Sequence, residues 1–149
     1  MNEPVYPNFV LDGIDRYAQH QAWLRAEGLS CDYRVNLIGI EPVRLAIRNA
    51  DFEDANLLGA YLPDAILRGA YFRCANLRSA YLRGADLSGA ILHGADLRCV
   101  YLRGANLEGA YLTEADLRGA NLRSANLEGA NLYNANLHLS LLHGAKSRN

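Results

Sequence analysis

Residues 85–109 read ADLSG, AILHG, ADLRC, VYLRG and ANLEG, five pentapeptides in unbroken register. The same pattern fills residues 50–144 as 19 consecutive pentapeptides without an insertion. The central position is always Leu or Phe, and the position two residues earlier is Ala in all but two repeats. Weaker copies carry the register back to residue 35, so the predicted array has 22 units over residues 35–144.

A period of five residues fits neither a regular helix nor a straight strand. On an α-helix, five residues turn the side chain by about 140°, so successive leucines would wander around the surface. On a strand, five steps place the side chain on the opposite face. A chain that bends once in each pentapeptide buries every leucine. The fifth position is Gly in ten of the 19 repeats, and a small residue there suits a tight turn.

Four such bends close a square, so the pattern predicts 20 residues in each coil. Within a coil, the Ala and the central Leu lie two residues apart and point inward, while their neighbours point outward. The sequence therefore predicts an all-β solenoid of about five coils, each stacked on the next at about 4.8 Å.

The A-(D/N)-L-x-G pattern of residues 85–89 and 105–109 resembles that of the pentapeptide-repeat family. The resemblance covers about three quarters of the chain. It implies a right-handed quadrilateral parallel β-helix with stacked Leu or Phe side chains inside.

A solenoid needs caps at its ends, because its terminal coils would otherwise expose strand edges. Residues 1–34 form the predicted N-terminal segment, with a capping α-helix over about residues 12–27. Asp12 is its expected N-cap and Gly28 its expected stop. We expect this helix to cover the first coil; a partner-binding helix is the alternative.

The C-terminal end has only a short predicted tail, residues 145–149. The last coil carries large apolar residues, several at positions that are elsewhere small or polar. These residues, the candidate dimer end, are Tyr133, Leu139, Leu141 and Leu142. An uncapped apolar end favours end-to-end pairing, so we predict a homodimer through the C-terminal coil. Some members of the resembled family pair in this way. The alternative is that the tail folds back over these leucines.

Residues 20 apart stack on one face, so the outward faces can be read from the sequence. Two adjacent faces carry arginines in columns, with tyrosines beside one of them. The candidate partner-binding face comprises Tyr81, Arg83, Tyr101, Arg103, Arg123, Arg78, Arg98 and Arg118. Such a face could bind phosphates, single-stranded nucleic acid or an acidic protein surface. The alternative is a solvated wall on which the arginines lie flat against the tyrosines.

The composition argues against several classes of function. The formal net charge is −1, and no apolar run is long enough to span a membrane, so neither nucleic acid nor a membrane is an expected partner. The N-terminus lacks the basic and apolar regions of a secretory signal. Three cysteines without a CxxC spacing fit a reducing compartment, and we expect a cytoplasmic protein.

We expect no catalytic residues, cofactor or metal. The carboxylates lie on a convex wall that offers no cleft. His138 and His143 fall on neighbouring faces of the last coil without a third ligand, which is weak evidence for zinc.

The sequence leaves two functions open. The first is a non-catalytic protein-interaction scaffold that presents charged and tyrosine-bearing faces to a macromolecular partner. The second comes from the family resemblance: a DNA-mimicking protein that binds DNA gyrase or another type II topoisomerase and inhibits it or protects it from poisons, a form of antibiotic resistance. Residues 50–144 contain ten acids and eight arginines, so their net charge is smaller than a DNA mimic would need.

Overall fold

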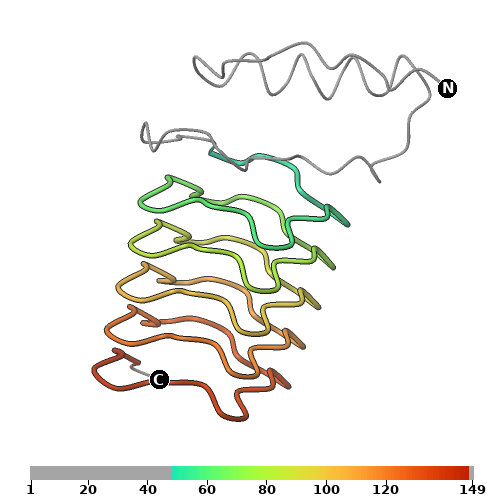
Figure 1. Cartoon of the computed structure of the whole chain (residues 1–149). Coiled ribbons are helices and arrows are strands. Elements are labelled where there is room, and N and C mark those ends of the chain that lie inside the picture. The colour runs from blue at the N-terminus through green and yellow to red at the C-terminus, as the bar shows by residue number, and fades with distance from the viewer. Residues whose placement is uncertain (1–47, 148–149) are drawn as a thin grey trace, which may run out of the picture.

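The computed structural model describes residues 48–147, which wind into a stack of four-sided coils (Figure 1). The predicted capping helix over residues 12–27 and the first predicted repeats, residues 35–47, lie outside the described residues. Within residues 48–147 there is no helix, and therefore none that could cross a membrane. The strands are reduced to single bridged residues, one on each side of each coil.

Parallel bridges join each coil to the next with an offset of 20 residues throughout. They run from Asp51 paired with Tyr71 to Asn126 paired with Lys146. The prediction of 20 residues per coil and of parallel stacking is confirmed. Ala145 and Lys146, placed in the tail by the sequence, also belong to the last coil: Ala145 packs against the core and Lys146 takes part in the bridging.

Backbone hydrogen bonds between coils hold this register in both directions. The Leu82 amide donates to the Tyr101 carbonyl at 2.9 Å, and the Tyr101 amide donates to the Ala80 carbonyl at 2.9 Å. The Gly84 amide adds a third bond, to the Arg103 carbonyl at 3.0 Å. This arrangement recurs from coil to coil, so a displaced pentapeptide would lose bonds to both neighbouring coils.

The corner of each side is a tight turn that the fifth residue makes. The carbonyl of Leu102, for example, accepts a hydrogen bond from the Ala105 amide at 3.0 Å. The third residue of such a turn has positive φ, as a type II turn requires. This holds at every corner from Asn49 to Gly144, at ten glycines and at ten other residues. The predicted role of the fifth position is confirmed, and it extends to Glu114 (φ 61°) and Leu139 (φ 59°).

The second position of the repeat braces the same corner. Where it is Asn or Asp, its side chain accepts a hydrogen bond from the backbone amide two residues later. Asn76 accepts from the Arg78 amide at 3.2 Å, and Asn106 from the Glu108 amide at 3.2 Å. Asn and Asp are the residues that favour such local turns. This accounts for their frequency at this position.

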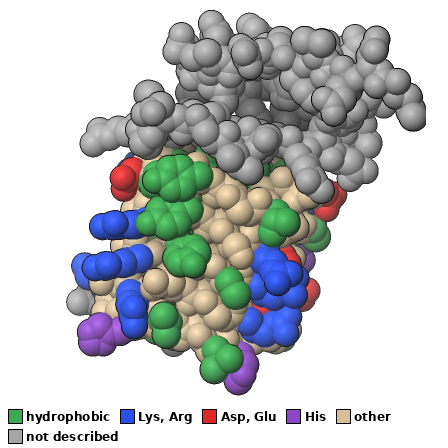
Figure 2. Space-filling view, in the orientation of Figure 1, with side chains coloured by type: hydrophobic (Ala, Val, Ile, Leu, Met, Phe, Trp, Pro, Cys, Tyr) green, Lys and Arg blue, Asp and Glu red, His purple; other side chains and the backbone are tan. Residues whose placement is uncertain are grey.

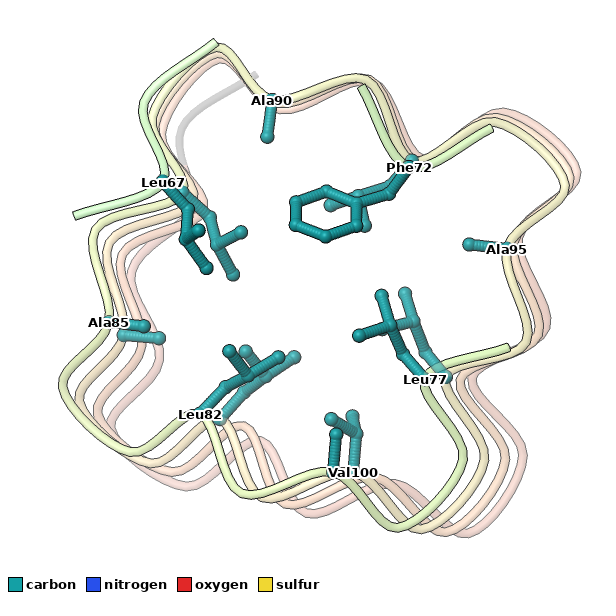
Figure 3. Packing of buried hydrophobic residues seen from close by; sticks show 14 of the residues in the cluster. Leu67, Phe72, Leu77, Leu82, Ala85, Ala90, Ala95 and Val100 are labelled. Carbon is teal, nitrogen blue, oxygen red and sulfur yellow. The ribbon is translucent and has the colours of Figure 1, made fainter. Parts of the chain in front are cut away.

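The core is a column of large residues separated by small ones. Figure 3 shows Leu67, Phe72, Leu77 and Leu82 pointing inward, with alanines between them along the sides. Each central residue from Leu67 to Leu122 is at most 1% exposed, and the described residues bury no polar or charged side chain. Alanine fits because four sides converge on a single axis. The inward positions predicted from the sequence are confirmed.

The buried leucines should dominate the stability of the array. Leu102→Ala removes a fully buried side chain and should lower the free energy of unfolding by about 2–5 kcal/mol, because the coils cannot collapse around the cavity. Leu58→Ala is the matched control, since Leu58 is 53% exposed and its truncation should cost only about 0.5 kcal/mol. Chemical denaturation followed by circular dichroism measures both. Equal losses for the two variants would contradict the buried column.

Candidate interaction surface

Three tyrosines on one face of the rod stack directly on each other. The ring centroids of Tyr61 and Tyr81 lie 5.2 Å apart, and those of Tyr81 and Tyr101 lie 5.5 Å apart. Parallel bridges join the same residues along the backbone. Tyr61 and Tyr101 are 45% and 47% exposed, although the rings cover part of one another's faces. The result is a rigid ridge of stacked rings.

An exposed column of arginines lies beside these tyrosines, at the position two residues later in the repeat. Its members are Arg83, Arg103 and Arg123. Their register is held by the backbone, since the Arg103 and Arg123 carbonyls accept hydrogen bonds from the Gly84 and Gly104 amides. Figure 2 shows a column of basic side chains beside a column of hydrophobic ones at the left of the view. We call these three arginines with Tyr61, Tyr81 and Tyr101 the Tyr–Arg surface.

The arginines of the Tyr–Arg surface have no acidic partner within residues 48–147. No ion pair forms at 4.0 Å or less between any of these three guanidinium groups and a described carboxylate. In this part of the chain, the tyrosines contact one another rather than the arginines. These three guanidinium groups are therefore unpaired with acidic side chains within the described residues, and the alternative of a solvated wall stays open.

The neighbouring arginine column is different, because two of its three arginines are paired with Asp residues. Arg98 pairs with Asp96 at 2.5 Å, and Arg118 pairs with Asp116 at 2.6 Å. Arg98 also reaches Asp116 of the next coil at 3.8 Å. Arg78, the third member, has an Asn two residues before it and forms no ion pair with a described carboxylate. The signal in the sequence was the residue two before each arginine, which is Asp before the paired arginines and Tyr or Asn before the others.

These pairs shift the acid–base equilibria of their members. The hydrogen bond from the Arg98 guanidinium lowers the pKa of Asp96, and partial burial opposes it only in part. Arg118 lowers the pKa of Asp116 in the same way. The hydrogen bond that each arginine donates to its Asp in turn raises the pKa of the arginine. Arg98 and Arg118 are therefore balanced by carboxylates on the same face, whereas the three arginines of the Tyr–Arg surface are not balanced by any described carboxylate.

On another side of the rod, Asp86 is at the centre of a polar ladder. Partial burial acts to raise its pKa, but hydrogen bonds from Arg68 and Ser88 outweigh this and lower it. Asn106 donates to Asp86 at 3.3 Å, and Asn126 donates to Asn106 at 3.1 Å. The polar groups of this ladder satisfy each other, so this side offers less unpaired charge than the Tyr–Arg surface.

The last coil carries the residues predicted as the dimer end. Tyr133 is 68% exposed and Leu139 is 76% exposed, while Leu141 and Leu142 are each 42% exposed. Leu142 occupies a central position of the repeat, where earlier leucines are fully buried. It is exposed because no further coil covers it within the described residues. All four predicted residues belong to the last described coil, with Tyr133 on the side opposite Leu141 and Leu142.

A metal cluster and a disulfide are two further kinds of site that bear on the described residues. Residues 48–147 contain no group of three or more His, Cys, Asp or Glu side chains that could hold a metal ion. Cys74 and Cys99 are free and exposed, and both are turn residues with positive φ. The distinctive chemical feature of the described surface is therefore its columns of charged and aromatic side chains.

The repeat pattern is recognised by a family model. The model for pentapeptide repeats matches residues 47–84, 70–109 and 101–138, which together exceed half of the chain. The chain therefore belongs to the pentapeptide-repeat family, as its motif predicted. The four-sided coil is the right-handed quadrilateral β-helix of this family.

Solved structures of similar fold include two from cyanobacteria. Rfr23 from Cyanothece 51142 is 29% identical with a TM-score of 0.61, and the match covers 70% of this chain and 81% of Rfr23. HetL from Nostoc sp. strain PCC 7120, a protein involved in heterocyst differentiation regulation, is 34% identical with a TM-score of 0.53. That match covers 69% of this chain but 53% of HetL, so the chain spans about half of HetL.

More distant is trypsin-treated QnrB1, a plasmid-mediated fluoroquinolone resistance protein. It is 24% identical with a TM-score of 0.42, over 67% of this chain and 61% of its own. A likeness this distant carries no inference about function. Comparison with curated protein sequences finds no significant match.

The Asp–Arg pairs should make stability depend on acid pH. Because the folded-state pKa values of Asp96 and Asp116 are lowered, their stabilisation is complete above the unfolded-state pKa of about 3.9 and is lost as the pH falls through the folded values. Denaturation at a series of pH values should give a constant free energy of unfolding near neutrality and a decline below about pH 4.

Replacing both aspartates by asparagine isolates this effect. Asp96→Asn with Asp116→Asn keeps the side-chain oxygen that accepts from the backbone amide but removes the charge, so the decline should become shallower. Asp64→Asn is the control, because Asp64 is exposed and forms no ion pair within the described residues. A decline as steep in the double variant as in the unchanged protein would disprove the contribution of these pairs.

Proposed function

We propose that this protein is a non-catalytic interaction scaffold that binds a macromolecular partner through the Tyr–Arg surface. The observation that carries this proposal is the column of Arg83, Arg103 and Arg123. These arginines stand in register on successive coils with no acidic partner among residues 48–147.

The contrast between the two arginine columns supports a binding role. Like charges directly opposite each other on neighbouring strands are destabilising. The chain relieves this repulsion at Arg98 and Arg118 by an Asp two residues earlier. At Arg83 and Arg103 the same position is Tyr, which leaves the charge for an external group. An anionic partner would supply the missing neutralisation.

Rigidity is the second support. Backbone bonds to the coils on both sides hold the Tyr–Arg surface, and its rings are packed on each other. A partner would therefore find the tyrosine rings and the backbone positions of the arginines already in place, which lowers the entropy cost of association. A convex outer wall over a core filled with Leu and Ala favours binding over catalysis.

The topoisomerase hypothesis stays a prediction. A DNA mimic needs a surface dominated by negative charge, and the described residues carry as many basic as acidic side chains. Asp86, Asp96 and Asp116 are each engaged by an arginine. A supercoiling assay with DNA gyrase, with and without a quinolone, measures this activity directly.

Affinity capture with matched variants tests the scaffold proposal. The bait is the full chain, either unchanged or with Arg83→Gln, Arg103→Gln and Arg123→Gln. Arg48→Gln with Arg68→Gln and Arg73→Gln is the control, because it removes the same charge from other sides of the rod. We expect quantitative mass spectrometry to identify a partner that the unchanged protein and the control retain and the first variant loses. A partner retained equally by all three would refute a role for this surface.

We further propose that the protein forms a homodimer through its C-terminal coil. The exposed leucines at positions 139, 141 and 142 form an apolar end that a second copy would cover. Several exposed leucines so close together in the sequence are unusual in the array, because most of its outward residues are polar.

Light scattering on purified protein should give twice the chain mass. Leu139→Asn with Leu141→Asn should give the single-chain mass without unfolding, because Asn134 and Asn121 already occupy the corresponding positions of other repeats. Leu58→Asn, near the other end of the described array, should leave the dimer intact. A single-chain mass for the unchanged protein would rule the dimer out.

A further inference from the structure

We infer that the Tyr–Arg surface binds an acidic amphipathic α-helix that lies along the rod axis. In this arrangement, carboxylates on successive helical turns meet Arg83, Arg103 and Arg123, and the apolar side chains beside them cover the exposed edges of the tyrosines. This inference names the chemistry of the partner and rests on the proposed function.

The spacing of the coils is close to the pitch of a helix. Parallel strands stack about 4.8 Å apart, and the ring centroids of successive tyrosines lie 5.2 and 5.5 Å apart. An α-helix advances about 5.4 Å per turn, so glutamates at positions i, i+4 and i+7 would depart from the coil repeat by only about 0.6 Å per turn, which long arginine side chains can absorb. An extended strand repeats a face about every 6.8 Å and would fall out of step by about 2.0 Å at each coil.

The stacked rings argue against a nucleic acid in this position. Proteins that bind single strands commonly stack bases on aromatic faces. A base inserted between two rings needs them about 7 Å apart, because stacked planar groups sit about 3.5 Å from each other. Here the Tyr81 ring is stacked on Tyr61 at 5.2 Å and tilted by 35° against Tyr101 at 5.5 Å, so neither gap is wide enough for a base. What remains outside is the ring edges, which suit packing of aliphatic side chains.

The ends of the column set the length of the bound segment. Pro63 precedes Arg83 in this column and His143 follows Arg123, so the run of permanent positive charge spans three coils. Three arginines call for acidic residues over at least two turns of helix, about eight residues. Each guanidinium can bind a carboxylate in a bidentate fashion, which fixes the helix register as well as its affinity.

A binding titration with designed peptides tests this inference. The probe is a fluorescent peptide of about 15 residues, long enough to be helical, with glutamates at i, i+4, i+7 and i+11 and leucines beside them. A second peptide has the same composition with the glutamates spread around the helix. A third keeps the glutamate spacing but carries two central prolines, which prevent the helix.

The protein is the full chain, either unchanged or as the two triple variants described above. We expect the helical probe to bind in the micromolar to millimolar range and about tenfold more weakly to the Arg83, Arg103 and Arg123 variant. The Arg48, Arg68 and Arg73 control should bind like the unchanged protein. The scrambled and proline peptides should bind more weakly by a similar factor.

Three results would overturn the inference. One is equal binding of the helical and proline peptides, and another is an equal loss in both triple variants. The third is binding of oligothymidine or of phosphatidylserine vesicles through these arginines in place of the helical peptide. That third result would leave the Tyr–Arg surface as a binding face and change only the class of partner. If, in addition, no captured protein depended on the three arginines, the proposed function would fail as well.

Discussion

The fixed offset of 20 residues between coils is the constraint on which the rest of this protein depends. Backbone hydrogen bonds to the coils before and after hold each pentapeptide, and a closed core of Leu and Ala fills the axis. No coil can slip by one residue without turning leucines outward and alanines into the corners. Every outward side chain therefore belongs to a column whose members lie on successive coils.

Because of this constraint, the residue type at one position of the repeat affects the charge of a whole column of the surface. An Asp at the second position reaches the arginine two residues later and balances it, as Asp96 does for Arg98. A Tyr at the same position stacks on the next Tyr of its column and leaves Arg103 to an external group. When the same residue type recurs at this position on successive coils, the arginines of that column become paired or stay unpaired. Neighbouring sides of one rod thus differ in charge although their backbones are equivalent.

Much of the fold could be predicted from the repeat, but the interactions of its outward side chains could not. The inward Leu and Ala and the turn at the fifth residue were predictable, since only a bend every five residues buries the leucines. Positive φ at Glu114 and Leu139 was not suggested by their residue types, because bulky residues rarely adopt it. The capping helix over residues 12–27 lies outside the described residues and stays a prediction. The eight residues predicted as one binding face include two arginines paired with Asp and three in the Tyr–Arg surface that are not paired within residues 48–147, a difference for which the residue two before each arginine was the available signal.

By itself, the sequence determined the coil, its register and the membership of each outward column. These depend on the spacing of apolar and turn-forming residues, which a linear pattern records completely. Only the tertiary structure decided which partner each side chain took: Arg98 an aspartate, Tyr81 two other tyrosines, and Leu142 none of the cover that earlier leucines receive. These outcomes depend on distances of a few ångströms between atoms on separate coils and on where the stack ends, and a repeat read along one chain does not contain them.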